Sequence, residues 1–541
     1  MKKAMFKTVS VLLICVFACS LTMGCKTKVP DTEDTLEIYI QELGYGRQWL
    51  NDEIELFKQQ DWVKEKYPNL NIPEPQHNAT YGYGGTLLRS GTTTVDLIFT
   101  LDMDVTFHTA LDERNRPYVA DLNDLFESTV PGETVKYKDK MYKEYADVCG
   151  YNDDTGKKIY RSVPWQAGYS NMMYNHDILV NKLGLTVPRT TDEFIAVCKA
   201  VSDLDGSNSA YKNKYSLAVT VERAGAAYWG AMMVPMWWAQ YEGMEGYYDF
   251  YRGIHNGARS KDVMTQRGRL ESLEVVQTLL SQYADKKMST LEFTSVQTNF
   301  LSGNILFMPN GDWLYEEMRT VVNDLKAQGI NYDIRFLKNP VISSIVDRTP
   351  SVKTVAAAQN KTSDAVLCEI IDAIDNGETE FAGIMPQDFT RIKEARTMIL
   401  MGDQGSQAFI PAGSTAEGLA KDFLLFLSTD IALEQYMKST GGASLPFYYS
   451  TDTQSELYKG FDNIQKTRIE IFSDNPFFSK STRSEEFKVH YLGGLKPFPV
   501  DTTIDEAFLD GSRTAKSYYD DCVAYYNDAR WRNVLRNAGY N

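Results

Sequence analysis

The stretch that decides the fold is VPWQAGYSNMMYN, residues 163–175, in which flat aromatic rings stand beside amide and hydroxyl groups. It fits neither a clean amphipathic helix nor a solubilising loop. One explanation is a half-buried strand whose methionines and Tyr174 fill a core. The other is a strand that passes between two lobes and presents Trp165 and Tyr169 to a cleft. We expect the methionines and Tyr174 in the core, and both explanations stay open for Trp165 and Tyr169.

Length and composition limit the number of lobes and the classes of ligand. The chain has 541 residues, which predicts two or more lobes, and its 33 Tyr suit surfaces that are part apolar and part hydrogen-bonding. The formal net charge is −16, and loss of the first 24 residues, which hold three Lys and no acids, would make it more negative. A body this acidic disfavours nucleic acid, anionic lipid headgroups and a strongly anionic ligand.

The N-terminus has the pattern of a secretory signal. Basic residues precede the apolar run Val9 to Phe17, which is too short to span a membrane. Leu21 to Cys25 then resembles the lipobox of bacterial lipoproteins, in which the Cys receives a diacylglyceryl thioether and becomes the mature N-terminus. Thr22 stands where that family usually has Leu. Lipidation at Cys25 is therefore expected, with Cys19 or plain secretion as the alternatives.

The first part of the body alternates strands and helices. Residues 36–40 and 95–100 read as strands, with a helical pattern through Trp49 and Phe57 between them. This alternation predicts a mainly parallel α/β sheet. Ligands of such sheets lie beyond the carboxyl ends of the strands. Candidate ligand-binding residues at these ends are Asp102, Asp104, Tyr45 and Arg47.

Further aromatic candidates follow in the second part. Tyr228 and Trp229 come after a predicted strand at 215–219, where the fold would place a ligand. The pair Trp237-Trp238 lies on a predicted helix, and we expect one of the two in the core.

The strongest single candidate is Asn310-Gly311-Asp312-Trp313. Here Gly allows a tight turn, Asp is expected to cap the helix that follows, and Trp projects beside the cap. A helix cap with a packed Trp is the alternative.

Several stretches, in order, resemble the sugar-type extracellular solute-binding proteins of bacterial ABC importers. The matching stretches are Ile38 to Phe57, residues 90–99, Tyr160 to Leu179, residues 184–194, Phe300 to Trp313 and residues 420–446. Val95 stands where the family usually has Pro. Residues 345–410 have no clear counterpart and look like an insertion, and the tail after residue 450 is long.

The resemblance implies an α/β, two-lobed periplasmic-binding-protein-like fold of type II, in which hinged lobes hold a ligand in the cleft between them. Crossings between lobes are expected near 155–163, 335–342 and 440–446. The expected divisions are a signal at 1–24, a tether at 25–34, a first lobe of 35–158 plus about 340–438 including the insertion, and a second lobe of 159–339 plus about 439–541.

The function implied by the resemblance is capture of an oligosaccharide and its delivery to the permease subunits of an ABC importer, from a lipid anchor in the membrane. The family's Trp at the position of Trp313 commonly lies against the sugar. We expect a monomer that breaks no bond and binds no cofactor, metal or nucleic acid. The ligand-binding candidates are Trp313, Asp312, Trp165, Tyr169, Trp229, Tyr228, Asp102, Asp104, Tyr45, Arg47, Trp238 and Ser444.

Two alternatives stay open. An extracellular glycoside hydrolase would share an aromatic cleft but would need two carboxylates about 5–10 Å apart in it. The same fold could also bind a peptide or another polar solute. The body has four cysteines without metal-type spacing, which either form disulfides or stay buried as thiols: Cys149, Cys198, Cys368 and Cys522.

Overall fold

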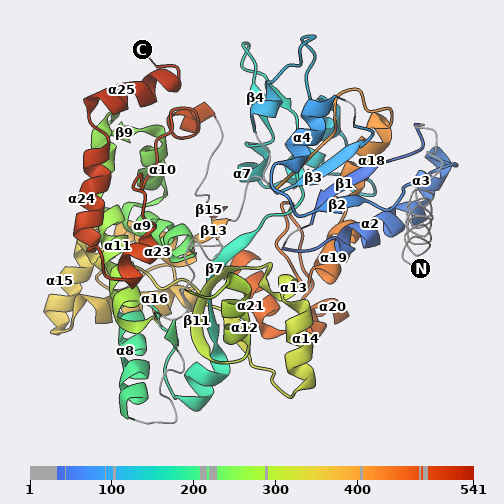
Figure 1. Ribbon diagram of the computed structural model, residues 1–541. Coiled ribbons are helices and arrows are strands. Elements are labelled where there is room, and N and C mark those ends of the chain that lie inside the picture. Colours follow the sequence, from blue (N-terminus) through green and yellow to red (C-terminus); the bar gives the residue numbers. More distant parts are fainter. Residues whose placement is uncertain are drawn as a thin grey trace, which may run out of the picture.

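The protein is organised as two lobes, each built around one β-sheet (Figure 1). The structure is a computed structural model. It describes residues 33–42, 44–91, 93–101, 105–207, 216–217, 228–284, 286, 290–401, 406–473, 477–478 and 485–540. The expected signal, the tether, Cys25, Asp102 and Asp104 lie outside the described residues, apart from the tether's last two positions.

The first lobe contains a five-stranded sheet in the order β2-β1-β3-β14-β6. Strands β1 (Ile38–Gln41), β2 (Gln76–Asn78) and β3 (Leu97–Thr100) are parallel, as predicted. Strand β14 (Gln407–Phe409) pairs antiparallel with β3 and with β6 (Val163–Pro164). The parallel strands therefore end at one common edge of the sheet.

Helices cover this sheet because each has one apolar face. In α2 (Gln48–Gln59), for example, Trp49, Ile54 and Phe57 are buried while Glu55 is exposed, although the charged Glu53 is also buried. The other elements of this lobe are α3 (Asp61–Lys66), α4 (Tyr83–Ser90), η1 (Val105–His108), α5 (Asn123–Glu127), α6 (Tyr137–Lys140), α7 (Lys143–Ala146), the hairpin β4 (Gly150–Asn152) and β5 (Lys158–Tyr160), α18 (Glu417–Phe426) and α19 (Asp430–Ser439).

The second lobe contains a mixed sheet centred on β7 (Tyr169–Asn175). Strands β11 (Ile305–Gly311), β12 (Ile334–Phe336) and β13 (Ile399–Met401) pair antiparallel with β7. The edge strands are β8 (Ser216–Leu217), parallel to β11, and β15 (Phe477–Phe478), parallel to β13. All seven residues of β7 are buried, because helices cover both faces of this sheet.

One face of the second sheet packs against a long helical wall (Figure 1). Its elements are η2 (Asp177–Lys182), α8 (Thr191–Ser207), η4 (Trp229–Met233), α9 (Val234–Glu242), α10 (Met244–Arg252), β9 (Ile254–His255), β10 (Ala258–Arg259), η5 (Lys261–Thr265), α11 (Arg267–Tyr283), η7 (Ser343–Asp347), α15 (Pro350–Gln359), α16 (Ser363–Asp375), α17 (Pro386–Thr397), η8 (Glu485–Phe487), α22 (Lys488–Tyr491), α23 (Ile504–Leu509), α24 (Ala515–Tyr525) and α25 (Asp528–Asn537).

The other face shares its core with the first lobe. Side chains from α12 (Phe293–Leu301), α13 (Leu314–Glu317), α14 (Arg319–Ala327) and α21 (Asn463–Ser473) belong to the same hydrophobic cluster as the core of the first lobe, and α20 (Glu456–Gly460) packs at its margin. Apolar packing is therefore continuous through the hinge, while the opposite side of the hinge stays open.

Three chain segments cross between the lobes and are hydrogen-bonded to each other. The first, between β6 and β7, holds Trp165 and Ala167, whose amides donate to the carbonyls of Ser406 at 3.4 Å and Ser444 at 3.1 Å. Ser406 lies between β13 and β14, and Ser444 follows α19. The first of these segments directly follows the range 155–163 expected for a crossing, and Ser444 lies inside the expected range 440–446.

The second crossing and the supposed insertion differ from expectation. The chain stays in the second lobe at 335–342, where β12 pairs with β7, and it leaves that lobe only after β13. Helices α15, α16 and α17 of the insertion pack into the core of the second lobe rather than the first. Their apolar faces match the wall of α9 and α11, a long-range preference that local patterns do not reveal.

Among the described residues, no helix is both long and apolar enough to cross a membrane.

Candidate functional site

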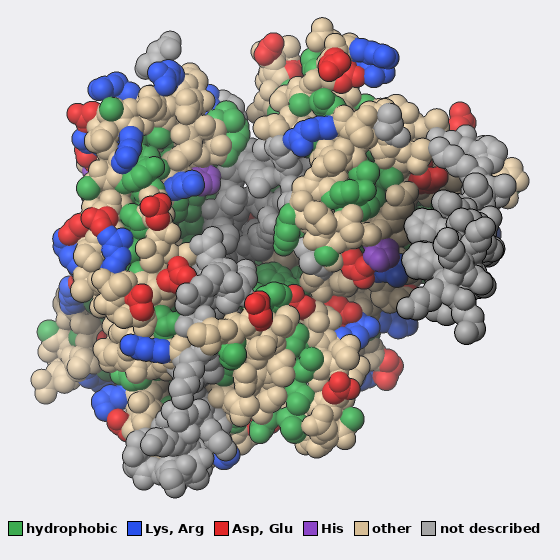
Figure 2. All heavy atoms as spheres, in the orientation of Figure 1, with side chains coloured by type: hydrophobic (Ala, Val, Ile, Leu, Met, Phe, Trp, Pro, Cys, Tyr) green, Lys and Arg blue, Asp and Glu red, His purple; other side chains and the backbone are tan. Residues whose placement is uncertain are grey.

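The carboxyl ends of β1 in the first lobe and β11 in the second lobe lie next to each other at a seam between the lobes. Strand β1 leads into Gly44 and Tyr45, and β11 leads into Asp312 and Trp313. A Cβ placed on Gly44 would lie 3.4 Å from the Cβ of Trp313, so the two edges meet here. Figure 2 shows a hollow between the two lobes. This is the place where open α/β sheets bind ligands.

Asp312 ties the lobes together at the bottom of the hollow. Its carboxylate accepts hydrogen bonds from the hydroxyl of Tyr45, the amide of Tyr169 at 3.2 Å and the amide of Ser444 at 2.8 Å. The guanidinium of Arg468, which is 4% exposed, donates to the Ser444 hydroxyl at 3.0 Å and interacts electrostatically with Asp312. Tyr45 comes from the first lobe and the other partners from the crossings or the second lobe. Asp312 is therefore a hinge residue.

This role corrects the expectation that Asp312 caps a helix. The N-cap position of α13 is Trp313, and no side chain caps that helix. Ser444 is likewise fully buried in the hinge, and Tyr45 is 2% exposed, so their side chains hold the lobes rather than offering surface to a ligand.

Trp313 lies at the seam, where it is half-buried and packs against the hydrophobic clusters of both lobes. Its indole ring lies over Gly311, where a Cβ would come within 2.0 Å of the ring. Only glycine allows the ring this position. The backbone beneath the ring thus holds it in place, and the side chain stays partly exposed.

Replacing Gly311 by Ala should displace the Trp313 ring. A Cβ only 2.0 Å from a ring atom cannot be accommodated without moving the indole or strand β11, which costs about 1–3 kcal/mol of unfolding free energy. Urea denaturation would measure this loss. The control is Gly418→Ala in α18, where a Cβ meets nothing within 4 Å and the substitution should be neutral or stabilising. Equal stability of the two variants would contradict the proposed ring position.

Tyr228 extends the aromatic lining across the hollow. It is half-buried at the start of the helical wall, and burial raises the pKa of its hydroxyl, with smaller contributions from Glu317 and from Tyr81. Tyr81 is 67% exposed and belongs to the first lobe, just beyond β2. Tyr228 and Tyr81 thus come from different lobes and lie near enough for a weak electrostatic influence.

A polar pair lies beside Tyr228. The Gln297 amide donates to the Glu317 carboxylate at 2.9 Å, and burial raises the pKa of Glu317. Tyr81, Glu317 and Gln297 were not among the sequence candidates. The signal for Tyr81 was the run TYGYGG directly after a strand, and Glu317 follows Trp313 by one helical turn.

Four of the aromatic candidates are buried away from the hollow. Trp165 stacks on Trp49 with ring centroids 5.1 Å apart, and Tyr169 is fully buried against Phe336. Trp229 and Trp238 are also fully buried, and the latter packs among the aromatic rings of α10. All four side chains are therefore packed in the core of this structure and have little surface to offer to a ligand.

The remaining candidates and thiols are placed as follows. Arg47 is an ion-pairing residue of the first lobe, with Glu74 at 2.8 Å and Glu42 at 3.6 Å. The four cysteines are buried free thiols. Within the described residues no group of His, Cys, Asp and Glu is arranged to hold a metal ion.

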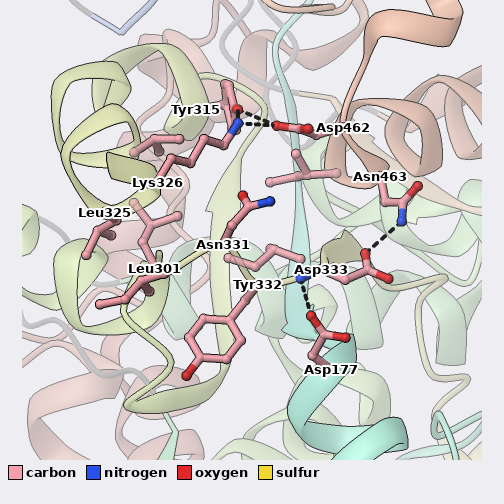
Figure 3. Close-up of a pocket in the computed structure, with 14 residues that line it drawn as sticks. Asp177, Leu301, Tyr315, Leu325, Lys326, Asn331, Tyr332, Asp333, Asp462 and Asn463 are labelled. Atoms are coloured by element: carbon pink, nitrogen blue, oxygen red, sulfur yellow. Dashed lines mark hydrogen bonds and ion pairs between the residues drawn. The ribbon is translucent and has the colours of Figure 1, made fainter. Parts of the chain in front are cut away.

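A separate surface pocket of about 210 Å³ lies in the second lobe, near the end of β7 and the starts of β11 and β12 (Figure 3). Much of its polar lining is already paired: Lys326 donates to Asp462 at 2.9 Å, and Asn463 donates to Asp333 at 2.9 Å. The interlobe hollow, with its partly exposed rings, is the better candidate site.

Asp505 supports the Tyr228 segment from behind and was also missed by the sequence analysis. It is fully buried, and its carboxylate accepts the backbone amides of Trp229 at 3.0 Å and Gly230 at 2.6 Å. Burial raises the pKa of Asp505 to about 7, the two amides act in the opposite direction, and neighbouring Glu506 adds a smaller upward contribution.

The pKa of Asp505 predicts a pH dependence of stability. An unfolded Asp ionises near pH 3.9, so between about pH 4 and pH 7 the folded protein holds a proton that the unfolded chain has lost. The unfolding free energy should therefore fall as pH rises through this window, by an amount on the order of 4 kcal/mol, and then level off. Urea denaturation of the wild type and of Asp505→Asn across this range tests it. A variant with the same pH slope as the wild type would contradict the prediction.

Comparison with known proteins agrees with this architecture. A model of the family described as "Bacterial extracellular solute-binding protein" matches residues 108–458. Among solved structures, the chain is similar to a chitin oligosaccharide binding protein, at 14% identity and a TM-score of 0.55, over 92% of this chain and 99% of that one. No curated protein matches the chain by sequence.

Two other solved structures are similar. One comes from a study of xylan utilization by a thermophilic bacterium, Caldanaerobius polysaccharolyticus, at 13% identity and a TM-score of 0.55, over 91% of this chain and all of that one. The other is the GacH receptor of Streptomyces glaucescens, described without ligand and with acarbose, at 12% identity and a TM-score of 0.53, over 94% of this chain and 99% of that one. The predicted two-lobed α/β fold is confirmed.

Proposed function

Because the chain belongs to the family of bacterial extracellular solute-binding proteins, we propose that it captures a neutral oligosaccharide between its lobes and delivers it to the permease of an ABC importer. The family makes the protein extracytoplasmic. We further propose that Cys25 carries a lipid anchor, that the protein is a monomer, and that it releases its ligand chemically unchanged.

The observation that carries this proposal is the position of Trp313. Its ring lies at the seam of the two lobes, partly exposed, and is held by Gly311 below it. A pyranose has patches of C–H on its faces, which pack on the negative face of an aromatic ring. Tyr228 and Tyr81 add rings that come from opposite lobes.

Polar groups beside these rings suit hydroxyl ligands. Sugar hydroxyls both donate and accept hydrogen bonds. Glu317, which is partly exposed and is held by the buried Gln297 amide at 2.9 Å, can accept from such a hydroxyl. The structures of similar fold include one named a chitin oligosaccharide binding protein and one described in complex with acarbose. A ligand that contacts both lobes favours the closed arrangement, which is the form that a permease could recognise.

A thermal-shift screen of oligosaccharides against peptides tests the proposal. A ligand that binds only the folded protein raises the melting temperature, so at least one neutral oligosaccharide should do so and peptides should not. Chromatography of the sugars after incubation should return them intact. A shift with peptides alone, or cleavage of the sugars, would instead favour a peptide binder or a glycoside hydrolase.

A further inference from the structure

The C-terminal part of the chain contributes to the wall of the hollow. The family match ends at residue 458, and residues 459–541 lie beyond it. Within this part, α23 contacts η4 and α11, and α24 runs along α11 (Figure 1). The segment that begins with Tyr228 is thus backed by a part of the chain that the family match does not include.

The contact is made by a buried carboxylate at a helix start. The first amides of a helix have no partner within it, and they favour a negative group beside them. Trp229 and Gly230 are the first residues of η4, which continues into α9. Asp505 accepts both of their amides, at 3.0 and 2.6 Å, without any exposure of its own.

The backbone at Gly230 also packs closely against the side chains at the start of α23. A Cβ added to Gly230 would lie 3.0 Å from Oδ1 of Asp505 and 3.1 Å from the Cβ of Ile504. The backbone at Trp229 and Gly230 therefore sits directly against α23. Tyr228, the residue immediately before this pair, is the N-cap residue of η4 and is partly exposed.

We propose that Asp505 is a positioning residue for the ligand site: by holding the amides of Trp229 and Gly230 it fixes where Tyr228 stands in the hollow. This inference rests on the proposed function, because Tyr228 is taken to contact the sugar. It assigns the C-terminal part a role in binding, without direct contact between Asp505 and the ligand.

The variants Asp505→Ala and Asp505→Asn test this in the full chain purified in detergent. The matched control is Thr503→Ala, which removes the N-cap of α23, where the Thr503 hydroxyl accepts the Glu506 amide at 3.3 Å, but leaves the Asp505 carboxylate in place. Calorimetric titration with the oligosaccharide from the thermal-shift screen measures affinity. Hydrogen exchange of peptides containing residues 229 and 230 reports the amide contacts without any ligand.

The expected result is a loss of affinity of about tenfold or more in Asp505→Ala, which corresponds to one lost positioning interaction. Asp505→Asn, which keeps one acceptor, should fall between Asp505→Ala and the wild type. Exchange at residues 229 and 230 should become faster in Asp505→Ala, while Thr503→Ala should melt earlier but keep wild-type affinity and exchange.

Wild-type affinity in Asp505→Ala would overturn the inference, as would an equal loss of affinity in Thr503→Ala. A wild-type protein that binds none of the sugars contradicts the proposed function. In that case exchange at residues 229 and 230 still decides whether Asp505 positions the segment, since unchanged exchange in Asp505→Ala would overturn that claim by itself.

Discussion

Replacing Trp313 by Ala should lower oligosaccharide affinity about 100-fold, which is about 2.7 kcal/mol, the size of loss typical of a central aromatic contact. The indole provides the largest partly exposed ring at the seam, and it faces both lobes. Its removal takes away the flat apolar surface on which a sugar face would pack. Isothermal titration with the sugar found in the thermal-shift screen measures the effect.

The control for this experiment is Trp62→Ala. Trp62 lies on α3 of the first lobe and packs edge-on against Phe57, with ring centroids 5.7 Å apart. Its loss removes an indole of the same size from outside the hollow, so affinity should stay at the wild-type value. If both variants bind as tightly as the wild type, Trp313 is not part of the site.

Replacing Asp312 by Ala should lower the unfolding free energy by about 4 kcal/mol. The change leaves the donors of Tyr45, Tyr169 and Ser444 without their acceptor. It also leaves the buried guanidinium of Arg468 without the nearby negative charge. Breaking a buried arrangement of this kind typically costs about 3–5 kcal/mol. Urea denaturation measures the loss.

An exposed ion pair provides the comparison. Asp203 contacts Lys199 at 2.6 Å, and both side chains are more than half exposed. Asp203→Ala should therefore cost less than about 0.5 kcal/mol. A similar denaturation midpoint in the Asp312→Ala and Asp203→Ala variants would show that the hinge does not depend on Asp312.

Much of the architecture could be predicted from sequence because it depends on local patterns. The alternation of strand and helix at 36–100 gives the parallel strands β1 and β3, and the turn at Gly311 places Trp313 at a strand end. Ordered short motifs also predicted the two-lobed fold. Each of these signals involves residues close together in the chain.

The predictions that differ from the structure concern contacts between residues far apart in the chain. The partners of Asp312 lie 132 to 267 positions away, so a local pattern suggested a helix cap instead. Trp165 alternates like a residue with one free face, but Trp49 from a distant helix covers that face. The same applies to residues 345–397, whose apolar stripes identify helices but not the lobe that receives them.

The site residues that the sequence did not indicate also depend on long-range contacts. Tyr81 is an ordinary loop tyrosine until the two lobes bring it near Tyr228. Nothing in the local sequence distinguishes Asp505 from the other acids. Its role depends on two backbone amides, about 275 positions earlier, that donate hydrogen bonds to it. Sequence patterns identify a strand end as a place for a ligand, whereas the residues that complete the site depend on how the lobes meet.

A crystal structure of the protein with the oligosaccharide that raises its melting temperature most would test the central claim directly. We predict electron density for the sugar in the hollow between the lobes, with one ring lying flat on Trp313 and contacts from both lobes. Sugar bound only on an outer surface, such as the pocket beside Tyr332, or an empty hollow with Trp313 enclosed in one lobe, would contradict it.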